Sequence, residues 1–223
     1  MWNEFNIKTF PAETAVFRDG VFCPELSTLN GTDILTRYDL PVHIIFIGEI
    51  AGKCRLNINI VAENQPVFLS VRVNNKKPAF LNIFIKNAGK NSELRGHVLM
   101  ENSDNLTYDC TAQHLTENTG ILIQNRLIGR EKSISKLSGR AIIEAGCDGC
   151  TSDVGFRAMC ESGARVEFRP AQYIRAVPNT ADHGAAIHNA TDDQILYLRQ
   201  AGLSGVEVNA AIRDAFVNDF TLF

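Results

Sequence analysis

Two cysteines at metal-ligand spacing are the first residues in this chain whose chemistry can be stated. Cys147 and Cys150 form a C-x-x-C pair. Two thiolates at this spacing can bind one metal ion, and Gly146 and Gly149 allow the backbone to wrap around it. The sequence holds no second C-x-x-C pair, so Cys160 is the nearest candidate for a third ligand.

A histidine supplies the fourth candidate ligand. Together with His183 the three cysteines form a Cys3His set, which suits zinc or an iron–sulfur cluster. The alternative is packing, because reduced cysteines are commonly buried as small apolar residues. Cys110 lies on the apolar side of an alternating run and favours that second interpretation. Both interpretations of the C-x-x-C pair stay open at this point.

Several other kinds of chemistry find no support in the sequence. There is no G-x-x-x-x-G-K-[S/T] loop, so we expect no bound nucleotide and assign any ATP hydrolysis to a partner. No Ser/His/Asp or paired-carboxylate spacing supports catalysis, and we expect the protein not to be an enzyme. With 22 Lys and Arg against 25 Asp and Glu, the formal charge of −3 recommends neither a nucleic acid nor an anionic membrane as partner.

The cellular compartment is also an expectation from the sequence. The first residues contain no apolar run typical of a signal peptide, and the longest apolar run, residues 42–47, is too short to span a bilayer. We therefore expect a cytoplasmic protein with reduced thiols.

The elements that must position these residues are mainly strands. Apolar and polar residues alternate with a period of two in successive runs, beginning near Val42 and continuing to about residue 178. We expect an irregular segment over 1–40 that packs on the core, and a β core over 41–187. Because alternation is common to several β architectures, it leaves two possibilities: a sandwich or jelly roll, or a β-helix of stacked coils.

The last part of the chain, 188–223, predicts a hairpin of two short helices. Thr191 and Gln194 have the spacing of a capping box, as do Ser204 and Glu207, and Gly202 can end the first helix in a left-handed conformation. A pair this short buries too little surface to fold alone. It must therefore dock on the β core, on a partner, or on both.

The order of motifs in the second half of the chain resembles the SufB/SufD proteins, the scaffold subunits of iron–sulfur cluster assembly. The motifs are Gln113–Gly120 ("QHLTENTG"), Gly139–Gly146 ("GRAIIEAG"), Pro170 to Ile174, His183–Ile187 ("HGAAI") and Tyr197–Leu203 ("YLRQAGL"). The resemblance is strongest over residues 180–217. His183 matches the histidine of the family.

This resemblance implies a right-handed parallel β-helix with a C-terminal helical hairpin. It implies that the hairpin docks a SufC-like ABC ATPase and that the last strands form a homodimer or a heterodimer with another chain of this type. A transient iron–sulfur cluster is expected near that interface. The residues expected to contact the partner are Gln194, Leu196, Tyr197, Leu198, Gly202, Ile212 and Phe216.

The chain also departs from the pattern of the family. It has about half the usual length and lacks the N-terminal helical domain of the larger members. The cysteine that SufB-type members carry before the proline motif is replaced by Gly155, and Gly184 follows the histidine as in SufD-type members. A second hypothesis is a small-molecule or metal-binding β-domain of the cupin or jelly-roll kind, unrelated to cluster assembly.

Overall fold

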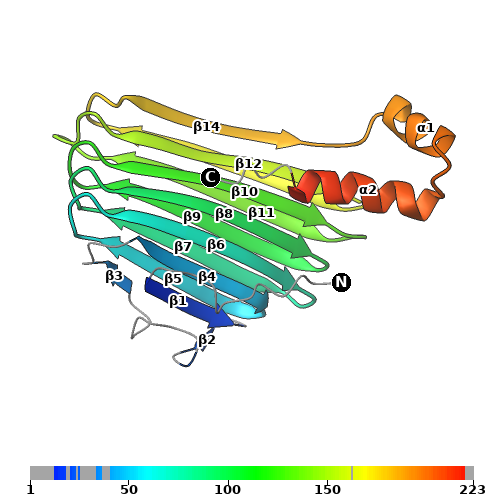
Figure 1. The fold of residues 1–223 in the computed structure, drawn as a ribbon, viewed down its shortest axis with the longest axis horizontal. Coiled ribbons are helices and arrows are strands. Elements are labelled where there is room, and N and C mark those ends of the chain that lie inside the picture. The colour runs from blue at the N-terminus through cyan, green and yellow to red at the C-terminus, as the bar shows by residue number, and fades with distance from the viewer. Residues whose placement is uncertain are drawn as a thin grey trace.

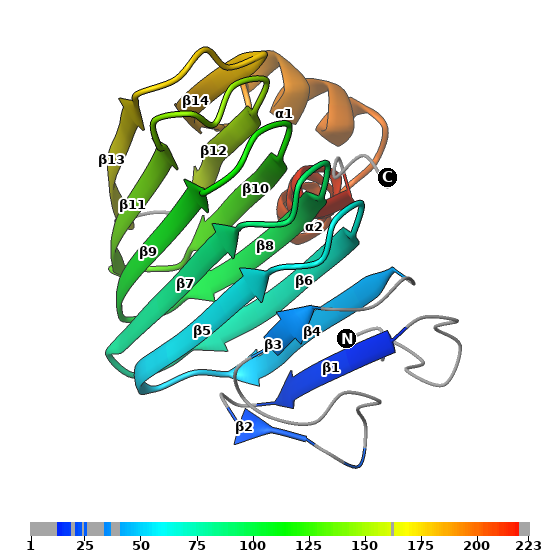
Figure 2. The same cartoon turned by 90° about the vertical axis from the view of Figure 1, so that its left-hand side faces the viewer.

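The chain folds into a parallel β-solenoid whose backbone passes alternately through two facing sheets, followed by two helices (Figures 1 and 2). The computed structural model describes residues 13–18, 21–23, 25, 34–36, 41–161 and 163–218. The prediction of a parallel β-helix with a C-terminal helical hairpin is confirmed. Its right-handedness stays a prediction.

From β3 (Ile34–Thr36) onward, successive strands of the chain belong alternately to the smaller and the larger sheet. The larger sheet contains β1 (Glu13–Arg18), β2 (Val21–Phe22), β4 (Val42–Glu49), β6 (Pro66–Asn75), β8 (Glu93–Asn102), β10 (Gly120–Gly129), β12 (Thr151–Cys160) and β14 (Thr180–Ile187). The smaller sheet contains β3 (Ile34–Thr36), β5 (Gly52–Ile60), β7 (Ala79–Asn87), β9 (Asn105–His114), β11 (Ile134–Ile143) and β13 (Arg165–Ile174). The helices are α1 (Asp192–Gln200) and α2 (Gly205–Asn218).

Strand pairing excludes the antiparallel alternative. From β5 onward, each strand pairs in parallel with the strands two places away in the chain, so one coil stacks directly on the previous one. Among the described residues only β1 and β2 pair antiparallel. A jelly roll is built from antiparallel strands, and that interpretation is therefore wrong.

The segment over 1–40 is more regular than the sequence suggested. Its described residues form three short strands, of which β1 adds to β4 in parallel and β3 adds to β5 in parallel. Turn residues such as Gly20 and Gly31 drew the prediction of an irregular segment, but pairing with a neighbouring strand outweighs local preference. The proposed boundaries at 40/41 and 187/188 stay predictions.

The core consists of columns of apolar side chains that run along the solenoid. In one column Val67 lies on Val42, Leu94 lies on Val67, and Ile121 lies on Leu94, all with almost no exposed surface. Full burial of such a side chain stabilises the fold by about 1.5–3 kcal/mol. Because the side-chain period of a strand is two, a slip of one residue would expose every column, which fixes the register of each coil.

The turns between coils repeat as strictly as the strands. Asn64, Asn91 and Asn118 occupy the same turn position in successive coils, with φ of 55°, 58° and 55°. Asn91 Nδ2 donates to Asn64 Oδ1 at 3.2 Å across 27 residues of sequence. Asparagine tolerates this left-handed conformation better than most residues do, so the three asparagines mark a coil length.

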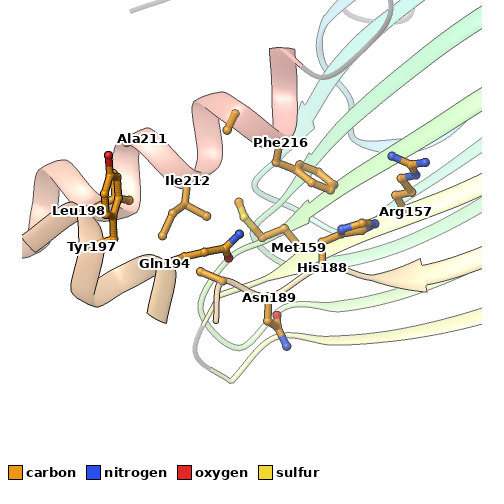
Figure 3. Close-up of a pocket in the computed structure, with 12 residues that line it drawn as sticks. Arg157, Met159, His188, Asn189, Gln194, Tyr197, Leu198, Ala211, Ile212 and Phe216 are labelled. Carbon is orange, nitrogen blue, oxygen red and sulfur yellow. The ribbon is translucent and has the colours of Figure 1, made fainter. Parts of the chain in front are cut away.

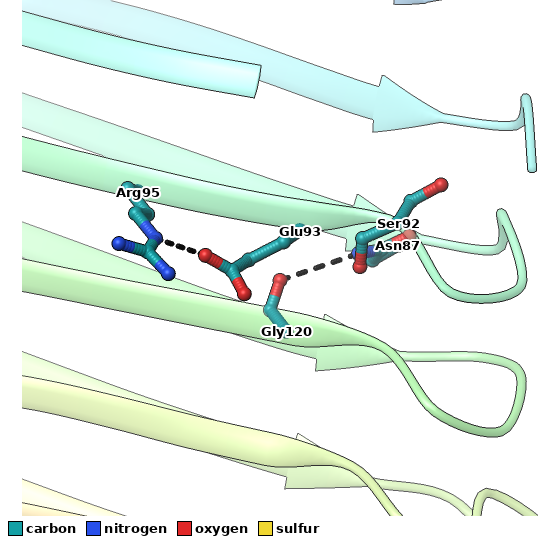
Figure 4. A network of polar contacts seen from close by, with 5 residues as sticks. All are labelled: Asn87, Ser92, Glu93, Arg95 and Gly120. Carbon is teal, nitrogen blue, oxygen red and sulfur yellow. Dashed lines mark hydrogen bonds and ion pairs between the residues drawn. The ribbon is translucent and has the colours of Figure 1, made fainter. Parts of the chain in front are cut away.

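A buried asparagine ties three segments together at one of these turns (Figure 4). Asn87 Nδ2 donates to the Ser92 carbonyl at 3.0 Å and to the Gly120 carbonyl of the next coil at 3.4 Å. Its Oδ1 accepts from the Gly89 N–H at 3.2 Å. On the outer side of β8, in the larger sheet, Arg95 donates to Glu93. Asn87 therefore links two backbone carbonyls of neighbouring coils and supplies the acceptor for the Gly89 N–H.

We expect Asn87→Ala to lower the free energy of unfolding by about 1–3 kcal/mol, because it removes the bonds of the buried amide and leaves the buried Gly89 N–H without its acceptor. Urea titration followed by circular dichroism measures this change. The matched control is Asn82→Ala on the same strand, where the amide makes one long bond of 3.4 Å to the Asp109 carbonyl at a partly exposed position. Equal losses in the two variants would contradict the role given to Asn87.

Candidate functional site: the open end of the solenoid and the helical hairpin

The last coil, made of β13 and β14, has a neighbour on one side only. Both strands stand at the edge of their sheets, so among the described residues their outer backbone groups have no strand partner (Figure 2). Apolar side chains accompany them, since Ile174 is 41% exposed and Ile187 is 53% exposed. Exposed edge strands with apolar residues are surfaces on which another chain can pair.

His183 lies in the middle of this edge. It pairs in register with Val154, whose buried side chain points into the solenoid, so the imidazole lies on the inner side of the last coil. No further coil in the described part of the chain covers it, and the residue is exposed. Gly184 has no atom within 4 Å of the place where a Cβ would stand. His183 therefore stands on an open surface that a second chain can approach.

Charged residues gather on the outer side of the same strands. Asp153 and Asp182 are register partners and line a cavity of about 420 Å³, which Arg126, Arg157 and His183 also border. Burial raises the pKa of the Asp153 carboxyl, and the neighbouring Asp182 carboxylate raises it further. The site thus combines an imidazole on one side of the β14 edge with two carboxylates on the other.

The C-x-x-C pair lies in the turn between β11 and β12, and both cysteines are buried. The Cys147 thiol donates to the His114 carbonyl at 3.5 Å, and the Cys150 thiol donates to the Thr116 carbonyl at 3.3 Å. They pack with Ile143 and, at the edge of this cluster, with Ala176 and Ala181. Burial, then the neighbouring Cys150, raises the pKa of the Cys147 thiol. These contacts are those of packed thiols.

The predicted Cys3His set does not converge in this chain. Cys160 ends β12, while Cys150 lies just before it begins, so the ten-residue strand separates them by about 30 Å at its usual rise. His183 lies on the neighbouring strand β14, where it pairs with Val154 of β12 and so lies away from both Cys150 and Cys160. Among the residues that the structure describes, no group of three or more His, Cys, Asp or Glu is placed to hold a metal ion. The structure thus does not bring Cys147, Cys150, Cys160 and His183 together within one chain, and their role as metal ligands stays a prediction.

His114 is a buried histidine that sequence analysis did not single out as a site residue beyond the motif match. Its Nδ1 lies 2.7 Å from Thr119 Oγ1, which also lies 3.2 Å from Cys150 Sγ. Its Nε2 has no hydrogen-bond partner, and burial lowers the pKa of the imidazole to about 4. His114 is therefore neutral near pH 7, and its ring packs in the turn that holds Thr119 and Cys150.

The helical hairpin begins and ends as the capping signals predict. Thr191 and Gln194 exchange both bonds of a capping box, and Ser204 Oγ accepts from the Glu207 N–H while Glu207 Oε2 accepts from the Ser204 N–H. Gly202, with φ of 93°, follows the C-cap of α1. No residue of α1 is buried, and Val208 is the buried residue of α2. The hairpin is therefore fixed at its C-terminal part and projects at α1 (Figure 1).

A groove of about 660 Å³ separates the hairpin from the outer face of the larger sheet (Figure 3). Phe216 anchors the hairpin beside it: the Arg126 guanidinium donates to the Phe216 carbonyl and lies 5.5 Å from the centre of its ring, and the His188 ring lies 5.9 Å away. Arg126 and His188 carried no sequence signal for this contact, because a strand residue and a loop residue far apart in the chain make it.

The residues expected to contact a partner fall into two groups. Those that line the groove are Gln194, Tyr197, Leu198, Ile212 and Phe216. Leu196 and Gly202 lie outside it and are exposed. Tyr197 belongs both to the lining of the groove and to the exposed surface of the hairpin, since it borders the groove and yet is 72% exposed. No helix in the described part of the chain is long and apolar enough to cross a membrane.

We expect the buried neutral His114 to make stability depend on pH. Its folded pKa of about 4 lies below the unfolded value of about 6.5, so its contribution is present above pH 6.5 and is lost as the pH falls toward 4. Unfolding free energies from urea titrations at pH 7 and pH 4.5 should differ by up to about 3 kcal/mol more in the wild type than in His114→Asn. The exposed His183→Asn serves as control and should keep the wild-type pH dependence; if it loses that dependence instead, His114 is not the group responsible.

Comparison with known proteins shows to which family this chain is related. The family model described as "SUF system FeS cluster assembly, SufBD core domain" matches residues 69–216, which covers most of the solenoid, the open end and the hairpin. A search of curated proteins gave no match. The resemblance seen in the motifs is confirmed: this chain belongs to the SufBD core domain family of SUF iron–sulfur cluster assembly.

Proposed function

We propose that this protein is a non-enzymatic scaffold component of a SUF-type assembly complex. Membership of the family connects it with iron–sulfur cluster assembly, and the match over residues 69–216 is the observation that carries the proposal. Both surfaces that a scaffold needs lie within that match: an open edge for a second chain and a projecting hairpin for a partner.

The hairpin is the proposed docking element for a SufC-like ATPase. α1 has no buried residue, yet it carries Leu196 and Tyr197 on its exposed surface. Large exposed apolar and aromatic side chains are typical anchors of a protein interface. The Phe216 contact holds α2 against the sheet, so the hairpin is presented in one orientation and less ordering accompanies binding. ATP hydrolysis is assigned to the partner because the sequence holds no phosphate-binding loop.

The open end of the solenoid is the proposed interface with a second chain of the same type, identical or related. β14 offers eight residues of unpaired edge, and Ile174 and Ile187 would be buried by a chain that pairs there. His183 would then lie between the two chains. A neutral imidazole can ligate iron, so His183 is the candidate ligand for a nascent cluster carried as cargo, with further ligands supplied by the partner chain.

We expect Tyr197→Glu to abolish binding of the SufC-type ATPase of the same genome. The variant places a carboxylate in the centre of the apolar docking surface, which costs several kcal/mol when buried. Co-expression followed by gel filtration with light scattering measures the complex. Leu115→Glu is the control, because it makes the same kind of change at an exposed leucine in the turn after β9. Unchanged binding by Tyr197→Glu would remove the hairpin from the proposed interface.

We expect Ile187→Asp to shift the protein from a dimer to a monomer, with at least about tenfold weaker association. A carboxylate at this position would be buried without a partner when a second β14 pairs alongside. Sedimentation velocity over a range of concentrations measures the change, again with the exposed turn variant Leu115→Glu as control. A wild-type protein that is monomeric at all concentrations, alone and with its related chain, would overturn the proposed interface.

A further inference from the structure

The outer face of the smaller sheet carries an excess of positive charge. The side chains of β5, β7, β9, β11 and β13 alternate between the core and this outer face, as their burial patterns show. The cations on the outer side, which we call the basic face, are Lys53, Arg55, Lys86, Lys136, Arg140, Arg165 and Arg169. The anions on the same side are Asp109 and Glu167.

The parallel register brings these cations onto one surface although they are spread over more than a hundred residues. Lys53, Lys136 and Glu167 belong to one row across the sheet, and Arg55 and Arg169 belong to the next row. Neighbouring strands are about 4.8 Å apart, and the screening length at physiological salt is about 8 Å. Lys136 and Arg140 on β11 adjoin Arg165 and Arg169 on β13, so these four cations act together on an approaching group. The remaining cations, Lys53, Arg55 and Lys86, lie two to four strands away from them.

The charge of this face contrasts with the rest of the chain. The whole protein has a formal charge of −3, whereas the basic face has seven cations against two anions. One anion is compensated locally, since Arg169 Nη2 lies 2.7 Å from Glu167 Oε1. Six of the seven cations are exposed, and the half-buried Lys86 lies over the Phe84 ring at 5.2 Å. The helices pack on the other sheet, so they do not cover this surface (Figure 2).

We propose that the basic face docks an acidic protein surface. Complementary charge raises the rate at which two proteins meet and fixes the orientation in which they do so. The face also offers Phe80 and Phe84, partly exposed aromatic side chains of a kind enriched at protein interfaces. Asp109 and Glu167 lie within the face and would repel the uniform phosphates of a nucleic acid, but they fit a partner whose surface is mostly acidic with a few cations.

This surface adjoins the open end at Arg165 and Arg169 of β13, but the residues chosen for its test lie outside both surfaces of the proposed function. The hairpin lies against the larger sheet, and Lys136 and Arg140 on β11 are one coil away from the open end. The proposal holds whether or not an ATPase binds the hairpin, and its test uses a different readout.

The experiment measures binding of a fluorescent oligo-glutamate peptide by anisotropy, at low salt and at near-physiological salt. Wild-type protein should bind saturably and lose affinity as salt rises. The double variant Lys136→Glu/Arg140→Glu should weaken binding by about tenfold, because two attractions become repulsions. The control Lys76→Glu/Lys90→Glu changes the net charge equally at exposed turns outside the face and should change affinity less than about threefold.

Each other outcome overturns the proposal. Absence of saturable binding, or equal weakening by both double variants, would mean that no specific acidic docking surface exists. Tighter binding of a single-stranded oligonucleotide of the same charge would assign the face to nucleic acid. Loss of ATPase binding in Lys136→Glu/Arg140→Glu would make the face part of the ATPase interface. Lys136→Gln/Arg140→Gln repeats the test if the charge reversal unfolds the protein, which circular dichroism detects.

Discussion

Parallel register between successive coils is the constraint on which the rest of this structure depends. Once one coil is placed, the side chain at every position of the next coil is fixed above it, because a slip of one residue would expose an entire apolar column. The position of His183 follows from Val154 below it, and Asp182 follows from Asp153 in the same way. The basic face is thus a consequence of stacking, since its residues are spread over more than a hundred positions of the sequence.

Alternation in the sequence predicts the strands well, but it does not distinguish their pairing. The apolar residues of β6 through β9 stand on the buried face as expected, because a period of two is a local property. Parallel coils and antiparallel hairpins share that period, so the architecture needed the family resemblance. A local signal was nevertheless present: Asn64, Asn91 and Asn118 mark the same left-handed turn position in three coils.

The candidate site was predictable where short-range rules apply and not where the fold brings distant residues together. Capping boxes depend on residues three positions apart, so both helix starts were predicted correctly. The Cys3His residues do not lie together within one chain, because C-x-x-C spacing says nothing about Cys160, which stands at the far end of a strand. The contact between Arg126 and Phe216 was not predicted for a related reason: 90 residues separate the guanidinium from the carbonyl that it contacts.

The two ends of the larger sheet are unlike, and this difference bears on how many copies can join. One end is β14, which runs parallel to its neighbour and has eight residues of edge; the other is β2, two residues that run antiparallel to β1. A head-to-tail contact would need β14 of one copy to continue onto the N-terminal edge of the next, and the reversed strand interrupts the parallel ladder there. Pairing of two like ends about a two-fold axis uses up both long edges. Among the described strands, the edges are therefore compatible with the proposed closed pair and do not continue into a head-to-tail ladder.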